Sequence, residues 1–297
     1  MSPNYCRKPT TWQPDMTARA SVPGSDVLLD DRDFARIAQL VHSLAGIVLA
    51  EAKRPLVHSR LIKRLRALNL PDFAAYADFI SAVGSDAERL ELISAVTTNV
   101  TSFFREQHHF DTLVALALPT LIAKAQAGER LRIWSAGCSS GEEPYSIAAT
   151  LLGLCPDVQR FDVRILATDI DQMMIARTRR AVYPPEAASG LSPDRLRCLF
   201  DAAAAGAPLH ICERAKRLVT CNALNLQDPW PMSGPFEIIF CRNVVIYFDK
   251  PTQERLWQRF ADMLSPEGFL MIGHSERITG PALSAFRAEG MTTYRRR

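Results

Sequence analysis

The sequence lacks the features of a membrane, secreted or zinc-binding protein. A helix that spans a bilayer needs about 18–20 apolar residues in a row, and no apolar run approaches that length. The seven cysteines are dispersed without C-x-x-C spacing, which argues against a disulfide framework or a zinc site. The N-terminus has no apolar segment of the kind found in secretory signals. These absences predict a cytoplasmic protein with reduced thiols, no membrane insertion and no metal site.

The sequence also has little net charge. Its 35 basic residues nearly balance its 32 acidic residues, so the formal net charge is +3. A domain that binds nucleic acid usually has a strongly basic balance, and no nucleic-acid partner is therefore expected. The hydrophobic content of 47% is ordinary for a globular protein, and 297 residues are enough for two domains.

The pattern of apolar residues divides the chain into three parts. Prolines and Gly24 punctuate residues 1–28 without any period, which predicts an irregular tail. In residues 29–97 apolar side chains recur at three- and four-residue intervals, which predicts an all-α domain. In residues 98–297 strands and helices alternate, which predicts an α/β domain with a doubly wound, mostly parallel sheet.

One segment of the α/β domain interrupts this alternation. Within residues 205–222, His210–Cys212 and Arg217–Cys221 have the character of short strands, and Glu213–Lys216 lies between them. We interpret this stretch as a small antiparallel β insertion with a turn at Glu213–Lys216.

A small-residue turn follows the first predicted strand of the sheet. Leu131–Trp134 is apolar, and Gly137 and Gly141 enclose a turn whose short side chains let a ligand approach the backbone. The turn lacks the G-x-G-x-x-G pattern, and the helix after it begins with Glu142 and Glu143, which would repel a pyrophosphate. These carboxylates favour a cationic ligand, such as S-adenosylmethionine with its ammonium and sulfonium groups. The alternative is an ordinary strand-to-helix crossover that binds nothing.

Polar residues follow other predicted strands, at the edge of the sheet where ligands bind. Asp169 ends the second strand and is expected to bind a ribose, although it could instead cap the next helix; Asp171 is at least as good a cap. Arg242 and Asn243 follow another strand, either facing the cleft or forming a solvated turn. Tyr247 lies one helical turn beyond Asn243, either in the cleft or in the core.

Two further segments supply candidate ligand-binding residues. Asn225 and Leu226 are placed to contact an adenine, or form part of a surface turn. Asn99, Thr101 and Arg105 lie at the junction of the two predicted domains, a favoured location for binding sites. Thr101 could equally cap the turn that follows it.

Together these motifs resemble the CheR family of chemotaxis receptor methyltransferases. The resemblance rests on NVTSFFR, SSGEEPYS, TDID, FCRNVVIYFD and GHSE, which begin at residues 99, 139, 168, 240 and 273. It extends in order from about Asp31 to Tyr294. It implies a class I methyltransferase-like fold and the transfer of methyl groups from S-adenosylmethionine to glutamate side chains of methyl-accepting chemotaxis receptors. The products would be S-adenosylhomocysteine and glutamate methyl esters.

The resemblance also assigns roles to individual residues. It implies a cofactor site lined by Asn99, Thr101, Arg105, Glu143, Asp169, Asn225, Leu226, Arg242 and Asn243. Arg105 and Tyr247 are the expected catalytic residues, and by the resemblance Tyr247 would lie near the transferred methyl group. A guanidinium can hold a carboxylate by bidentate contact, so Arg105 could orient either the substrate's carboxylate or the cofactor's; we favour the cofactor's. In some family members the β insertion docks a receptor's C-terminal peptide, and the sequence leaves open whether this chain does so.

A basic helix in the first domain is a candidate receptor surface. Arg60, Lys63 and Arg64 share one face at three- and four-residue spacing. Receptor methylation helices are acidic, so this face would steer the receptor electrostatically; the alternative is a solvated helix face.

Two other functions compete with receptor methylation. A nucleic-acid methyltransferase should show a basic cleft with stacking aromatics, which the sequence lacks. A protein that binds S-adenosylmethionine without turning it over is the other alternative. We expect an active enzyme that acts as a monomer.

Overall fold

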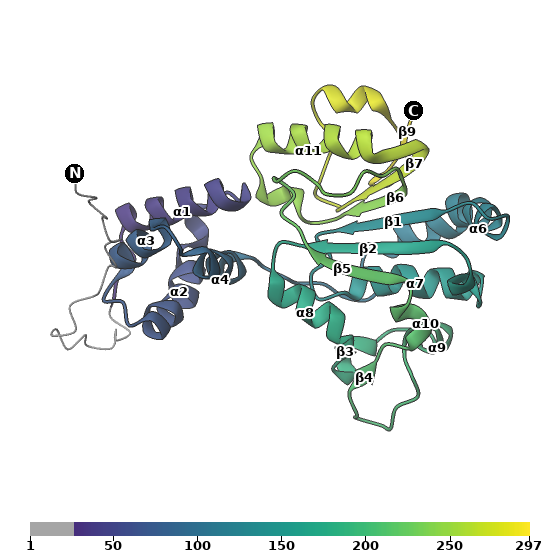
Figure 1. The fold of residues 1–297 in the computed structure, drawn as a ribbon, viewed down its shortest axis with the longest axis horizontal. Coiled ribbons are helices and arrows are strands. Elements are labelled where there is room, and N and C mark those ends of the chain that lie inside the picture. The colour runs from purple at the N-terminus through teal and green to yellow at the C-terminus, as the bar shows by residue number, and fades with distance from the viewer. Residues whose placement is uncertain (1–26) are drawn as a thin grey trace, which may run out of the picture.

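The computed structural model describes residues 27–297, which form a helical domain and an α/β domain (Figure 1). The predicted tail, residues 1–28, lies almost entirely outside this range. Of the helices in the described residues, none combines the length and apolar character needed to cross a bilayer.

The helical domain contains four α-helices packed around one core. They are α1 (Asp31–Ala45), α2 (Arg54–Leu68), α3 (Phe73–Ser81) and α4 (Asp86–Val96), with a short 3-10 helix, η1 (Glu51–Lys53), before α2. Asp30 caps the start of α1 by accepting a hydrogen bond from the Asp33 backbone N–H, and Gly46 ends α1 with a φ of +72°. Val41, Leu61 and Ile80 are fully buried between the helices. The predicted helical periodicity therefore reflects one shared core.

A seven-stranded sheet forms the centre of the α/β domain. Its strand order is β5-β2-β1-β6-β7-β9-β8. Neighbours from β5 to β7 pair in parallel, and β9 pairs antiparallel with both β7 and β8. The strands are β1 (Leu131–Ala136), β2 (Val163–Asp169), β5 (Val219–Ala223), β6 (Phe236–Cys241), β7 (Leu264–Ile272), β8 (Phe286–Gly290) and β9 (Thr293–Arg296).

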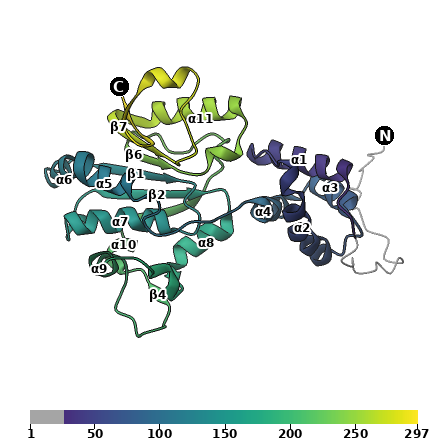
Figure 2. The same cartoon turned by 180° about the vertical axis from the view of Figure 1, so that it is seen from behind.

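Successive side chains of the strands enter two different cores, one on each face of the sheet. Ile133 packs with the helices on one face and Trp134 with those on the other. Figures 1 and 2 show α11 on one side of the sheet and α7 and α8 on the other. The main helices are α5 (His108–Thr112), α6 (Leu118–Gln126), α7 (Glu142–Leu154), α8 (Gln172–Arg180), α9 (Pro193–Leu199) and α11 (Lys250–Met263). Shorter helical segments are η2 (Leu113–Ala117), η3 (Val158–Arg160), η4 (Pro185–Ala188), η5 (Val245–Tyr247) and η6 (Pro281–Ala285).

The chain order of the strands creates a crevice at one edge of the sheet. From β1 the chain adds β2 and β5 on one side and then crosses to place β6 and β7 on the other. In open parallel sheets, ligands bind at such a switch point, outside the carboxyl ends of the strands. The predicted doubly wound, mostly parallel sheet is confirmed, and the helical domain lies beyond the carboxyl ends of its parallel strands (Figure 1).

The predicted pairing within the β insertion is wrong. The structure has a small antiparallel sheet, but it joins β3 (Val182–Tyr183) to β4 (Leu209–His210). The predicted turn is a short helix, α10 (Glu213–Lys216), and the second predicted strand is β5, which pairs in parallel with β2. Two short apolar segments separated by four residues resemble a hairpin locally, whereas their actual partners are distant in sequence.

Candidate active site

A cavity lies at the carboxyl ends of β1, β2, β5 and β6. It holds about 1000 Å³ of space including its open mouth, enough for a nucleoside-sized ligand. All the residues predicted from the sequence to bind the cofactor or take part in catalysis line it. They are Asn99, Thr101, Arg105, Glu143, Asp169, Asn225, Leu226, Arg242, Asn243 and Tyr247.

The glycine turn leaves the floor of the cavity without bulky side chains. Gly137 and Gly141 both have a positive φ, of +86° and +101°, a conformation that most other residues avoid. A Cβ on Gly137 would lie 2.3 Å from a methyl carbon of Val244. Gly137 is therefore required both by the backbone conformation of the turn and by the close approach of the loop after β6.

Asp169 presents a buried carboxylate to the cavity. Its Oδ2 accepts a hydrogen bond from the Ser139 backbone N–H at 2.8 Å, and its Oδ1 accepts one from the Asp171 N–H at 2.9 Å. Burial raises the pKa of Asp169 to about 6. The cap of α8 is Asp171, which accepts from the Met173 N–H. The predicted alternative, that Asp169 is the helix cap, is therefore wrong.

Arg242 and Glu143 form a buried ion pair beside the turn. Arg242 Nε donates to Glu143 Oε2 at 2.7 Å, and the Ser135 hydroxyl donates to Glu143 Oε1 at 2.6 Å. Arg242 also donates to the main-chain carbonyl of Arg105. The alternative that places Arg242 in a solvated turn is wrong, because its side chain is only 3% exposed. Since Arg242 balances the charge of Glu143, the turn attracts a cationic ligand less strongly than its two glutamates suggest.

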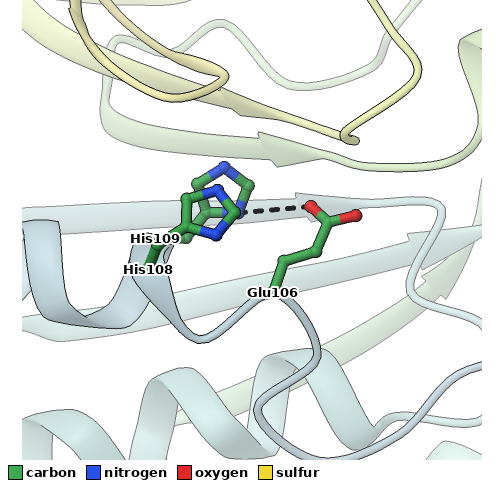
Figure 3. Close-up of side chains that lie close together, drawn as sticks. All are labelled: Glu106, His108 and His109. Atoms are coloured by element: carbon green, nitrogen blue, oxygen red, sulfur yellow. Dashed lines mark ion pairs between the residues drawn. The ribbon is translucent and has the colours of Figure 1, made fainter.

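Glu106, His108 and His109 lie close together (Figure 3), and two of them contact Arg242 of this ion pair. Each offers a metal-ligating atom, and these atoms lie within 4.8 Å of one another. However, the Arg242 guanidinium lies 3.8 Å from Glu106 Oε2 and 3.4 Å from His109 Nδ1. Because arginine only donates, His109 Nδ1 must accept, and its Nε2–H donates to the Thr292 hydroxyl at 2.9 Å.

The electrostatics of this cluster favour a guanidinium over a metal ion. Burial, followed by the charge of Arg242, lowers the pKa of His109 to about 3, so its ring is neutral. Glu106 Oε1 lies 3.0 Å from His274 Nδ1 and 3.5 Å from the amide nitrogen of Asn243. We therefore interpret Glu106 and His109 as supports of Arg242 and Asn243, and we assign no metal to them.

The loop after β6 is held by a glutamate that sequence reasoning did not single out. Glu276 Oε1 accepts from the backbone N–H groups of Val244 and Val245 at 2.9 and 2.7 Å. Its Oε2 accepts from the N–H groups of Asn243 and Gly273 at 3.1 and 2.6 Å. The signal in the sequence is the acidic residue in GHSE, a motif placed after an apolar strand.

The helical domain supplies one wall of the cavity. Ala45, Ile47 and Lys53 line it, although none of them was predicted. The Asn225 side-chain amide donates to the Leu44 carbonyl at 2.9 Å, and the Val48 N–H donates to the Tyr247 carbonyl at 2.8 Å. Asn225 thus connects the two domains, in addition to lining the cavity.

The remaining predicted cavity residues lie along the linker between the domains and on η5. Arg105 Nη1 donates to the Val100 carbonyl at 2.8 Å, and the Asn99 amide donates to Asp171 Oδ2 at 2.9 Å. Tyr247 is half-buried and packs against the core of the helical domain. Both expectations for Tyr247, the cleft and the core, are therefore partly correct.

The three residues predicted on the basic face of α2 do not line the cavity. Arg60 donates to the carbonyls of Ala95 and Thr97 at the end of α4. Arg64 donates through Nε and Nη2 to both carboxylate oxygens of Glu88. Lys63 is exposed. The two arginines therefore have structural partners within the domain.

Comparison with known proteins identifies both parts of the chain. Residues 32–97 match the family model described as CheR methyltransferase, all-alpha domain, and residues 99–295 match CheR methyltransferase, SAM binding domain. A probable chemotaxis protein methyltransferase of Rhizobium etli is 47% identical over 86% of this chain and 96% of that protein. The chemotaxis protein methyltransferase of Salmonella typhimurium is 41% identical over 90% of each chain. Chemotaxis protein methyltransferase 2 of Pseudomonas aeruginosa is 42% identical over 88% of this chain and 92% of its own. The chain therefore belongs to the CheR methyltransferase family, whose members use S-adenosylmethionine.

Proposed function

We propose that this protein transfers methyl groups from S-adenosylmethionine to glutamate side chains of methyl-accepting chemotaxis receptors. The observation that carries the proposal is the cavity at the strand ends, which gathers the ten residues named above from the α/β domain and is completed by Ala45, Ile47 and Lys53 of the helical domain. The family match and the relatives named chemotaxis protein methyltransferases support the same activity. We place the acceptor glutamates in the receptors' cytoplasmic helical region, and we propose that the enzyme acts there as a monomer.

The residues of the cavity fit S-adenosylmethionine. The buried carboxylate of Asp169 can accept hydrogen bonds from ribose hydroxyls. The guanidinium of Arg105 suits the cofactor's carboxylate, and the segment Asn225–Leu226 suits the adenine. Gly137 also lines the cavity, and its lack of a side chain lets Val244 of the loop after β6 pack against the turn.

The cofactor, when bound, supplies an electrophilic methyl group: an acceptor oxygen forms the new C–O bond, the S–C bond breaks, and its electron pair stays on sulfur. A glutamate has an unperturbed pKa of about 4.3, so it is ionised at pH 7 and needs no general base. The protein's task is to orient the carboxylate and exclude water, and orientation alone can contribute about 7–11 kcal/mol. Tyr247 stands in the cavity wall where both domains meet, which supports its proposed place beside the reacting groups.

Methyl transfer to receptor membranes tests the proposal directly. Purified protein is incubated with methyl-tritiated S-adenosylmethionine and membranes that contain chemotaxis receptors. We expect label on a receptor band that mild base releases as methanol, because esters hydrolyse readily and methylated amines do not. Tight binding of cofactor without transfer would support the non-catalytic alternative, and label on nucleic acid would contradict the proposed substrate.

A further inference from the structure

Lys53 is a cation in the cavity wall that the proposed cofactor site does not use. It ends η1, in the helical domain, and its ammonium lies 4.5 Å from the centroid of the Tyr247 ring. The side chain is half-buried and lines the same cavity as Arg105 and Asp169. Its position brings a positive charge from the receptor-facing domain to the proposed place of methyl transfer.

The other charged groups of the cavity wall already have partners. Arg242 is paired with Glu143, and Asp169 accepts two backbone hydrogen bonds. Arg105, bonded to the Val100 carbonyl, is assigned to the cofactor's carboxylate. In the described part of the chain, the Lys53 ammonium has no carboxylate partner.

The surroundings of Lys53 suit an anionic ligand. Burial, and then the nearby charge of Arg60, lower the pKa of Lys53. Both effects disfavour the ammonium form when no anion is present, and an incoming carboxylate would relieve both. Arg60 itself is held by the carbonyls at the end of α4, so Lys53 is the better placed of the two to meet a ligand in the cavity.

We propose that Lys53 binds the acceptor carboxylate beside Tyr247 and so selects an anionic side chain over a neutral one. The inference rests on the proposed function and deepens it by naming the group that positions the substrate. It also gives the helical domain a direct part in the reaction, because η1 brings Lys53 to the cavity.

The charges of reactant and product determine how this interaction should affect the kinetics. The acceptor carries a full negative charge before the reaction, a smaller one in the transition state, and none in the ester. The ammonium therefore binds the reactant most strongly and the product most weakly. Such an interaction should lower KM for the receptor and aid release of the ester, with little effect on kcat.

Kinetics of a Lys53→Met variant test this assignment. Initial rates are measured against a chemoreceptor cytoplasmic fragment at saturating S-adenosylmethionine, and the Kd for S-adenosylhomocysteine is measured by calorimetry. We expect KM for the fragment to rise at least about fivefold, because a charge-assisted hydrogen bond is lost. We expect kcat to change less than about threefold and the Kd to stay the same. Lys53→Arg, which keeps the charge, should recover much of the KM.

A matched control removes the same charge elsewhere. Lys124 lies on α6 and its side chain is 55% exposed; Lys124→Met should leave all three constants unchanged. Circular dichroism and Tm establish that each variant is folded.

A measurement independent of turnover complements the kinetics. Lysines of the wild-type protein are labelled with acetic anhydride in the presence of S-adenosylhomocysteine, and modified residues are quantified by mass spectrometry. The receptor fragment should slow labelling of Lys53 several-fold, and a fragment whose methylation-region glutamates are replaced by alanine should not. Labelling of Lys124 should be unaffected by either fragment.

Three results would overturn the assignment. One is an unchanged KM in folded Lys53→Met, and another is equal protection of Lys53 by both fragments. The third is a higher Kd of the Lys53→Met variant for S-adenosylhomocysteine with an unchanged KM for the receptor fragment, which would mean that Lys53 binds the cofactor. Failure of the proposed function is a separate result, in which the wild-type protein transfers no base-labile methyl group to the receptor. The three results above, in contrast, overturn only the role of Lys53.

Discussion

The carboxylates around the cavity act mainly as hydrogen-bond acceptors for the protein itself. Asp169 holds the glycine turn through the Ser139 N–H, Glu143 holds Arg242, and Glu276 holds the loop after β6. A carboxylate without such donors would be costly to bury. Their arrangement also shows why the sequence reveals only part of their role. An acidic residue after a strand can be recognised in the sequence, whereas the groups that donate hydrogen bonds to it come from distant loops.

The raised pKa of Asp169 predicts a pH-dependent affinity for the cofactor product. Ribose hydroxyls donate best to an ionised carboxylate, and with a pKa of about 6 only about a tenth of Asp169 is ionised at pH 5. We expect affinity for S-adenosylhomocysteine to fall about tenfold between pH 7 and pH 5. Calorimetry at a series of pH values would measure this. Asp169→Asn should bind more weakly and show no such fall; an equal fall in that variant would assign the titration to another group.

The same raised pKa has the opposite consequence for the stability of the free protein. Folded Asp169 holds its proton more tightly than the unfolded chain, where the pKa is near 3.8. Its contribution to the free energy of unfolding therefore declines as pH rises from about 4 to 6 and is constant above that range. The difference in free energy of unfolding between the wild-type protein and Asp169→Asn isolates this contribution, and its pH slope across this range should be opposite in sign to that of binding.

At the scale of elements, the site depends on loops that approach one another closely after each strand. A Cβ on Gly273, after β7, would lie 2.5 Å from the Asn243 amide nitrogen and 2.6 Å from its backbone nitrogen. Backbone cannot yield as a flexible side chain does. The loop that carries Arg242 and Asn243 can therefore pack this closely only if residue 273 has no side chain.

Gly273→Ala should consequently damage the cavity, whereas Gly153→Ala should not. The first change should displace Asn243, lower Tm, and weaken binding of S-adenosylhomocysteine about tenfold or more. Gly153 lies in α7, and no atom comes within 4 Å of the position that a Cβ there would occupy. Alanine there should stabilise the helix by up to about 1 kcal/mol. Thermal unfolding and calorimetry on both variants check the pair, and unchanged binding in Gly273→Ala would contradict the expectation.

The basic face of α2 offers a second contrast between neighbouring residues. Lys63 is exposed, whereas Arg64 bonds both oxygens of Glu88, which also accepts from the Tyr76 hydroxyl. If α2 steers acidic receptors, Lys63→Glu should slow methylation and reduce its dependence on salt, without changing Tm. Arg64→Glu should lower Tm, since it leaves a buried carboxylate unpaired. Methylation rates at several salt concentrations would decide between a steering face and a solvated one. Unchanged rates in Lys63→Glu would indicate a solvated face.

Sequence reasoning is most successful where function depends on residues directly after a strand. The ends of parallel strands meet at one edge, so the pattern of the chain alone is enough to group Asp169, Arg242 and Asn243. It fails where pairing is set by distant partners. Arg217–Cys221 has the composition of a hairpin strand, but it adds to the sheet beside β2. Lys53 is one charge among several in its segment, and nothing local indicates that η1 reaches the cavity.

At the scale of the whole molecule, the two domains together enclose the cavity. His42 Nε2 lies 3.0 Å from Asp249 Oδ2, and Asn225 bonds the Leu44 carbonyl. The C-terminal end of α1 thereby lies against the loops after β5 and β6. Domain interfaces of this kind are a preferred location for ligand sites. The helical domain therefore forms part of the wall of the proposed cofactor site, in addition to carrying the proposed receptor-facing surface.

This shared site predicts that the cofactor product stabilises backbone in both domains. Hydrogen–deuterium exchange of the intact protein, followed by mass spectrometry, would compare free and S-adenosylhomocysteine-bound states. We expect slower exchange in the segment 44–53, because Ala45, Ile47 and Lys53 line the cavity and the Val48 N–H is bonded to Tyr247. Exchange in the glycine turn after β1 should slow as well. Bound product opposes any local opening of the backbone that would break the site. Peptides from α3, whose residues do not line the cavity, serve as the internal reference. Protection confined to residues beyond 98 would show that the α/β domain binds the product alone, and the helical domain would then contribute to the receptor side only.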